Sequence, residues 1–179
     1  MENIRLKKLI FSAIFLAFGF ILPMFFGQLP TIGQMLVPMH IPVFLCGMVC
    51  DWKHGAIIGF ILPLLRSLIF SVPVLYPTAI SVAFEMCTYG LVVGILYGYS
   101  KKKSLTTIYF SMLIAMILGR IIRCIAQIIL LNIQKNPFVW KTFFTGVILN
   151  SIPGIILQLI IIPIVMIALK RSKLIEFSK

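Results

Sequence analysis

The chain has 179 residues, of which 61% are hydrophobic and 11% charged, and its sixteen Lys and Arg against four Asp and Glu give a formal net charge of +12. Soluble domains are about 45–50% apolar and about 25% charged, and a small one has too little interior to bury this much apolar surface. A nucleic-acid-binding domain clusters its positive charge on one face, whereas these basic residues separate long uncharged runs. The composition excludes soluble enzymes and nucleic-acid binders and indicates a polytopic membrane protein.

Six apolar stretches separated by Gly, Pro and charged residues predict an all-α fold of six membrane-spanning helices, a single membrane domain over residues 1–179. The second stretch is short, roughly 13 residues or about 20 Å of helix. The basic start followed by an apolar run is similar to a signal peptide, but no small-x-small cleavage site follows, so we interpret it as the first helix. The predicted spans are Leu6–Phe26, Pro38–Cys50, His54–Phe70, Pro77–Tyr99, Leu105–Leu131 and Val139–Leu169.

The basic residues between the spans predict the orientation, because cytoplasmic segments carry an excess of Lys and Arg. With the N-terminus inside, the outer segments hold only Lys135 and Lys141. Both termini are therefore expected in the cytoplasm, which requires an even number of spans. The eleven basic residues on the cytoplasmic side are Arg5, Lys7, Lys8, Lys53, Lys101, Lys102, Lys103, Lys170, Arg171, Lys173 and Lys179.

Four charged residues lie in the interior of the predicted spans, away from the span ends where Lys7, Lys8 and Lys141 stand: Arg66, Glu85, Arg120 and Arg123. A charge at mid-membrane depth costs roughly 2.5–3.5 kcal/mol on insertion scales, so such residues are kept when paired or functional. One interpretation is that Glu85 pairs with a single arginine and locks the bundle. Two arginines then lack an intramembrane acid. Because a guanidinium binds carboxylate or phosphate in a bidentate manner, an anionic ligand, a small organic carboxylate first, would balance that excess.

Polar residues of four spans lie at similar depths, between the midplane and the outer surface. The two arginines of the fifth span share one helical stripe with Gln127, and Glu85 shares a stripe of the fourth span with Tyr89. Asn150 lies about eleven residues down the sixth span. We therefore expect a polar pocket that opens to the outside.

The outer loop 27–37 is uncharged and apolar, and includes Leu36. It is expected either to fold over the pocket or to lie in the lipid headgroups, and both alternatives stay open. His40, which follows at the start of the second span, is a second candidate for this gate, although an interfacial histidine with a structural role fits the sequence as well.

Small residues recur at a spacing of four, which lets helices approach closely in lipid. Each pair is more often intramolecular packing than a partner surface. The pairs are Ala13/Ala17, Gly55/Gly59, Gly90/Gly94/Gly98 and Ala115/Gly119.

Motifs of membrane enzymes and ATPases are absent from the sequence: there is no His-Glu-x-x-His, no Gly-x-x-x-x-Gly-Lys-Ser/Thr and no Gly-x-Ser-x-Gly. We expect no catalytic residues, no cofactor and no ATP hydrolysis by this chain. Cys46 and Cys50 share a helix face, but a zinc site needs four closely spaced ligands, so no metal is expected. Uphill transport would then draw on an ion gradient or a partner, and the lack of an internal repeat favours a partner.

The chain resembles the substrate-binding S components of energy-coupling factor (ECF) transporters, the bacterial vitamin importers. The basic N-terminus and the six spans are shared with the family as a whole. Several short stretches are similar to one branch of it, which has pantothenate-type and hydroxymethylpyrimidine- or pyridoxine-type members. The stretches that carry it are Ala13-x-x-x-Ala17, Val37-Pro-Met-His-Ile-Pro-Val43, Pro63-Leu-Leu-Arg-Ser67, Pro73-x-x-Tyr76-Pro77, Glu85-x-x-x-Tyr89-Gly90 and Gly119-Arg120.

The resemblance implies a subunit of the bacterial cell membrane that captures a vitamin from outside, in a site built from the first outer loop and spans four to six. It also implies docking on a T component that carries two ABC-type ATPases, with Ala13 and Ala17 in the docking surface. The ATPases use the ATP, and membrane lipid is the other partner.

On this resemblance, the arginines of span five would bind the anionic group of the vitamin, with pantothenate first. A neutral pyridoxine- or hydroxymethylpyrimidine-type vitamin is the alternative, and a self-sufficient small secondary transporter or channel is the alternative of another class. An intramembrane enzyme has almost no support from the residues. The expected substrate-binding residues are Glu85, Tyr89, Arg120, Arg123, Gln127, Asn150 and Arg66, and the expected loop gate is Leu36 and His40.

Overall fold

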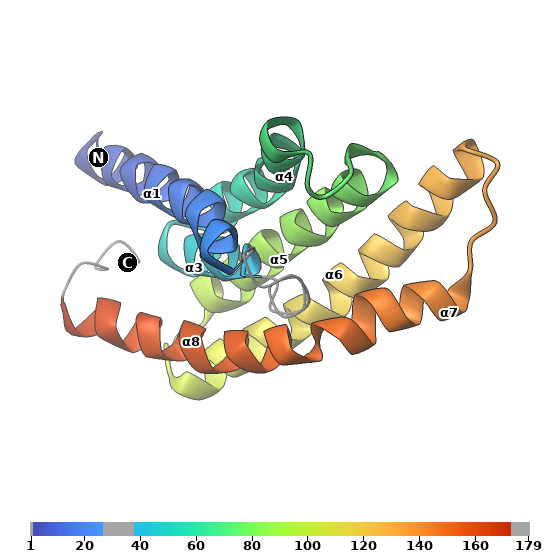
Figure 1. Ribbon diagram of the computed structural model, residues 1–179. Coiled ribbons are helices and arrows are strands. Elements are labelled where there is room, and N and C mark those ends of the chain that lie inside the picture. Colours follow the sequence, from blue (N-terminus) through green and yellow to red (C-terminus); the bar gives the residue numbers. More distant parts are fainter. Residues whose placement is uncertain (1, 27–37, 173–179) are drawn as a thin grey trace.

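The computed structural model describes residues 2–26 and 38–172, and the regular structure in this part of the chain is all helical, with no strand (Figure 1). The loop 27–37, with Leu36, lies outside the described residues. Two short π-helical turns (η1, η2) and one 3₁₀ turn (η3) interrupt the helices. The elements are α1 Glu2–Phe26, α3 His40–Val49, α4 Trp52–Phe70, η1 Leu75–Ala79, α5 Ile80–Tyr99, α6 Leu105–Ile133, α7 Trp140–Phe143, η2 Phe144–Ile148, η3 Leu149–Ser151 and α8 Ile152–Arg171.

Five helical segments of the described chain are long and apolar enough to cross a membrane. The shortest has 19 residues, or about 28 Å of helix, close to the roughly 30 Å of a bilayer core. The sixth apolar helix, α3, has only 10 residues. The all-α membrane fold is thus confirmed, while helix length alone supports five spans. The five segments are Ile4–Phe25, Trp52–Phe70, Leu75–Tyr99, Leu105–Ile133 and Phe144–Arg171.

Polar caps set two helix starts. The Asp51 side chain accepts a hydrogen bond from the backbone N–H of His54 at 3.0 Å, so α4 begins at Trp52, two residues before the predicted start. The Ser104 hydroxyl accepts one from the N–H of Thr107 at 3.3 Å and starts α6 at Leu105, as predicted. Both caps satisfy a donor that the first helical turn leaves without an intrahelical partner.

Glycines bring α3, α4 and α5 into backbone contact. A Cβ atom on Gly55 of α4 would lie 2.6 Å from the Cα of Gly47 in α3, and one on Gly47 would lie 2.6 Å from the carbonyl oxygen of Gly90 in α5. Such contacts matter in lipid, where apolar burial gives helices no driving force and close packing must supply it. Glycines at spacing four therefore serve intramolecular packing here.

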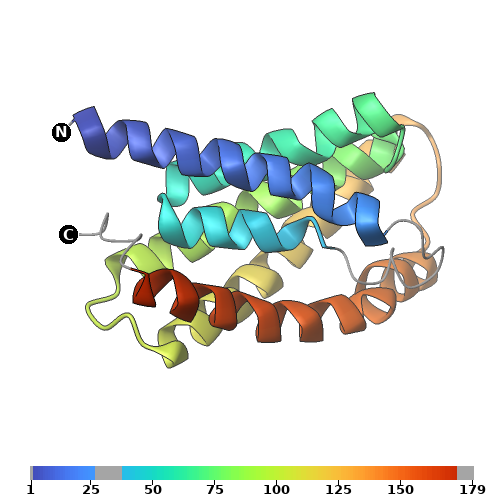
Figure 2. The same ribbon diagram turned by 60° about the vertical axis from the view of Figure 1, so that its left-hand side comes forward.

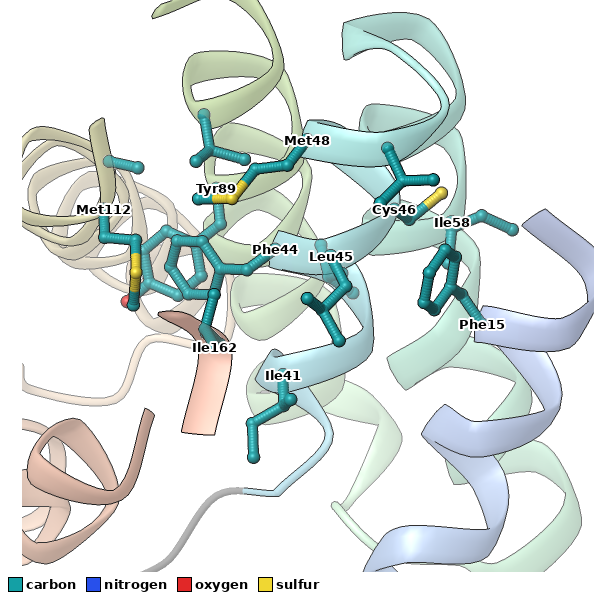
Figure 3. Packing of buried hydrophobic residues seen from close by; sticks show 14 of the residues in the cluster. Phe15, Ile41, Phe44, Leu45, Cys46, Met48, Ile58, Tyr89, Met112 and Ile162 are labelled. Carbon is teal, nitrogen blue, oxygen red and sulfur yellow. The ribbon is translucent and has the colours of Figure 1, made fainter. Parts of the chain in front are cut away.

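Helix α3 is surrounded by protein, and all ten of its residues are buried. It packs against α1, α4, α5 and α8. Figure 3 shows the side chains around it, with Phe15 contributed by α1, Tyr89 by α5 and Ile162 by α8. A helix that is apolar on every side suits this position.

The start of α1 is attached to the α3–α4 corner through Asp51. Lys8 Nζ lies 3.1 Å from Asp51 Oδ2, and His54 Nδ1 lies 2.8 Å from Asp51 Oδ1. Burial raises the pKa of Asp51, but hydrogen bonds from the ring and backbone of His54 and from Lys8 outweigh it and hold the pKa at about 2. Asp51 is therefore ionised at neutral pH.

Figure 2 shows the N-terminal end of α1, the C-terminal end of α8 and the α5–α6 connection at one end of the bundle. The α6–α7 connection lies at the opposite end. This arrangement separates the lysines of residues 101–103 and 170 from Lys135 and Lys141.

Candidate functional site

Glu85 of α5 is the centre of a buried charged cluster and is fully shielded from solvent. Its Oε1 lies 3.2 Å from Arg120 Nε, and its Oε2 lies 2.8 Å from Arg123 Nη1. Of the interpretations left open by the sequence, the pairing of Glu85 with arginine is present, but with both arginines rather than with one. Because the two arginines are three residues apart, they share a face of α6, and each carboxylate oxygen of Glu85 contacts one of them. The cluster holds two positive charges and one negative charge.

Arg120 also ties α6 to the irregular segment before α8. Its Nη1 donates to the Val147 carbonyl, and its Nη2 donates to the Ser151 hydroxyl at 2.8 Å. Val147 lies in the π-helical turn η2, where the departure from α geometry leaves its carbonyl accessible to a side chain. Sequence reasoning missed both partners. Pro153, which disturbs hydrogen bonding in the turn before it, is the signal that a helix irregularity lies here.

Tyr89 lies one turn from Glu85 and donates a hydrogen bond from its hydroxyl to Glu85 Oε1 at 2.6 Å. Its ring stacks on Phe44, with centroids 5.0 Å apart, and meets the edge of His40 at 5.3 Å. Gly119 of α6 lies against this ring, and a Cβ atom there would collide with it. The predicted binding residue Tyr89 is thus held by two neighbouring helices, α3 and α6, and by Glu85 of its own helix.

Several buried polar atoms near this cluster have no hydrogen-bond partner among the described residues. They include Nε of Arg123, Oε1 of Gln127 and Nε2 of His40, a side chain that is 1% exposed. Gln127 lies one turn beyond Arg123, as the sequence predicts. Since at least about 90% of buried polar groups in proteins are hydrogen-bonded, these atoms mark capacity for a polar ligand.

Other predicted residues lie apart from the cluster. Asn150 is exposed, and no hydrogen bond joins it to the cluster. Arg66 packs its guanidinium over the Phe70 ring at 5.9 Å, and two of its buried nitrogens are unpartnered within the described chain. Within residues 2–26 and 38–172, no group of three His, Cys, Asp or Glu could hold a metal ion. Two surface grooves, beside Phe110 and beside Ile125, include no cluster residue, so a pocket open to the outside stays a prediction.

Ala13 and Ala17 lie on the exposed face of α1, opposite the buried side chains Ser12 and Phe15. Exposed apolar neighbours on the same helix include Phe18. The two alanines are therefore accessible to another helix, and their docking role stays a prediction.

A bundle of apolar helices around a buried charged cluster is typical of a membrane transport protein. The family model of the ECF transporter substrate-specific component matches residues 7–166, so this chain belongs to that family, as the resemblance predicted. The family is a transporter component and not an enzyme. Searches of curated proteins and of solved structures found no match.

Proposed function

We propose that the chain captures a small vitamin with one negative charge from outside the cell, with pantothenate as the first candidate. The observation that carries the proposal is the charge of the buried cluster. Glu85 balances only one of the two arginines that contact it, at 3.2 and 2.8 Å.

The magnitude of that imbalance favours a monoanion. An uncompensated charge in a low-dielectric interior is costly, and one carboxylate balances it. A phosphate dianion would reverse the sign of the cluster and needs more donors than the unpartnered atoms of Arg123 and His40 offer. Pantothenate has one carboxylate, and its hydroxyls and amide suit Gln127 Oε1 and the remaining polar atoms.

The proposal includes six spans, with α3 as the second, and both termini in the cytoplasm. The lysine-rich end of the bundle, with residues 101–103 and 170, would face inward under the positive-inside rule. Glu85 and its arginines then lie between the midplane and the outside.

Transport would require partners, namely a T component and two ABC-type ATPases. The family assignment supports this assembly, and so does the absence of an ATP-binding motif in the sequence. The exposed alanines Ala13 and Ala17 are the proposed contact with the T component.

The test is calorimetric titration of the purified chain with pantothenate and with the analogue in which a hydroxymethyl group replaces the carboxylate. Hydrogen bonds to charged groups contribute about 1.5–3 kcal/mol, so the analogue should bind roughly 10- to 150-fold more weakly. Equal affinities would contradict the charge argument. Tight binding of a neutral pyridine or pyrimidine vitamin would establish the alternative instead.

The variant Arg123→Gln should bind pantothenate more weakly by the same factor, and its affinity for the analogue should be unchanged. Lys141→Gln, at an exposed position of α7, is the matched control and should change neither affinity. Because Arg123→Gln also removes a partner of Glu85, the double variant Glu85→Gln/Arg123→Gln is measured with it, and the folded state of both variants is checked by thermal unfolding. Vitamin uptake by the chain alone in proteoliposomes would establish a self-sufficient transporter.

A further inference from the structure

A groove of about 480 Å³ opens between α5 and α6 at the end of the bundle that carries the α5–α6 connection. Its volume lies within the roughly 300–1,000 Å³ of small-molecule sites. None of the residues of the charged cluster lines it. The apolar side chains Ile95, Leu96 and Phe110 form much of its wall, and the hydroxyls of Ser100, Thr106 and Thr107 lie toward its end.

Hydrogen bonds hold the basic connection against this groove. The Lys102 carbonyl accepts from the Ser100 hydroxyl at 3.0 Å and from the Thr107 hydroxyl at 2.7 Å, and both donors line the groove. Lys101 and Lys102 are exposed. The groove therefore has an apolar body, and the exposed Lys101 and Lys102 follow directly after Ser100 at its end.

Further positive charge gathers beside the same connection. The ammonium groups of Lys103 and Lys170 lie 5.6 and 5.8 Å from the centre of the buried Tyr97 ring, and Lys170 donates to the Lys103 carbonyl. Burial lowers the pKa of Lys103, and the Lys170 charge lowers it further. These two ammonium groups add positive charge beside the α5–α6 connection.

We propose that this groove binds an anionic phospholipid of the cytoplasmic leaflet, with an acyl chain along Leu96 and Phe110 and the phosphate on Lys101 and Lys102. Basic pockets between membrane helices on the cytoplasmic side recognise anionic headgroups, at roughly fivefold in affinity for each Lys. The inference rests on the proposed orientation of the chain and is independent of the vitamin.

A phospholipid fits this groove better than a free phosphate or a peptide does. A free phosphate would leave the apolar walls without contact, and an apolar helix would leave the lysines unpaired. The acyl chain of a lipid would contact the apolar walls, and its phosphate would contact the lysines.

Native mass spectrometry of the purified chain tests the site, after exchange into nanodiscs containing equal amounts of phosphatidylglycerol and phosphatidylcholine. The unaltered chain should release from the nanodisc with phosphatidylglycerol bound. Lys101→Gln/Lys102→Gln should lower that retention about 25- to 30-fold relative to phosphatidylcholine. Lys135→Gln/Lys141→Gln makes the same change of charge at the opposite end and should retain the lipid.

A second pair of variants separates the groove from general surface charge. Thr106→Trp fills the groove and leaves every lysine in place, so it should also release the lipid. Ile117→Trp adds the same ring at an exposed position of α6 outside the groove, so this variant should keep the lipid bound.

The proposal would be overturned if Lys101→Gln/Lys102→Gln and Lys135→Gln/Lys141→Gln lost phosphatidylglycerol equally. It would also be overturned if Thr106→Trp retained the lipid. Displacement by inorganic phosphate alone would overturn the lipid source. A protein bound in the groove in place of the lipid would also overturn the assignment of a lipid as the occupant. Pantothenate affinity is measured on the same samples, so failure of the vitamin proposal is distinguishable from failure of this one.

Discussion

Replacing Glu85 by Gln keeps the shape of the side chain and removes the acid that, among the described residues, alone contacts Arg120 and Arg123. Gln can still accept a hydrogen bond, but two partly buried guanidinium groups then lie near each other without a counter-charge. Removing one partner of a buried ion pair costs about 3–5 kcal/mol. For a chain of this size, at roughly 2–4 °C per kcal/mol, the expected fall in Tm is about 6–20 °C.

Thermal unfolding in detergent, followed with a thiol-reactive dye, measures this change, because Cys46 and Cys50 are buried and react on unfolding. Thr88→Val, one turn from Phe84 on the same helix, is the matched control and should stay within about 2 °C of the parent. A carboxylate ligand should restore part of the loss in Glu85→Gln, while its neutral analogue should not.

A Tm of Glu85→Gln within 2 °C of the control would refute the assignment of Glu85 as the counter-charge. The double variant Glu85→Gln/Arg123→Gln gives a second check. If charge imbalance causes the loss, the second substitution should reduce it, and the coupling energy should be about 0.5–3 kcal/mol.

Three further predictions concern helix packing, pH dependence and partner docking. Gly90→Ala places a Cβ against the backbone of α4 and should lower stability by about 1–3 kcal/mol in the same assay, whereas Gly98→Ala, with open space around it, should raise stability by up to about 1 kcal/mol. Because its folded pKa of about 2 lies below the ordinary 3.8, Asp51 should contribute stability above pH 4 that is lost as the pH falls toward 2, and this pH dependence should disappear in Asp51→Asn. Ala17→Trp should abolish co-purification with a T component and two ATPases while pantothenate affinity is unchanged, and retained assembly would argue against the docking face.

The helices were predictable because apolar runs of about 20 residues have one stable form in lipid, and the stripe spacing of Arg120, Arg123 and Gln127 follows from helical geometry. The bridging role of Glu85 was not predictable, because it depends on the rotation of α5 against α6, which the Gly119–Tyr89 contact sets. Counting depth along an ideal helix made Asn150 a candidate. The π-helical and 3₁₀ turns before α8 change the rotation there, and Ser151 contacts Arg120 instead.

Helix α3, with its ten buried residues, has a consequence for biogenesis. At 1.5 Å per residue it is about 15 Å long, half of a roughly 30 Å bilayer core, so it lacks the length of a segment that inserts independently. Its contacts are with α1, α4, α5 and α8, three of which are synthesised after it. The contacts that bury α3 are therefore complete only after α8 has been synthesised, and truncated chains that end before α5 should expose α3 to proteases.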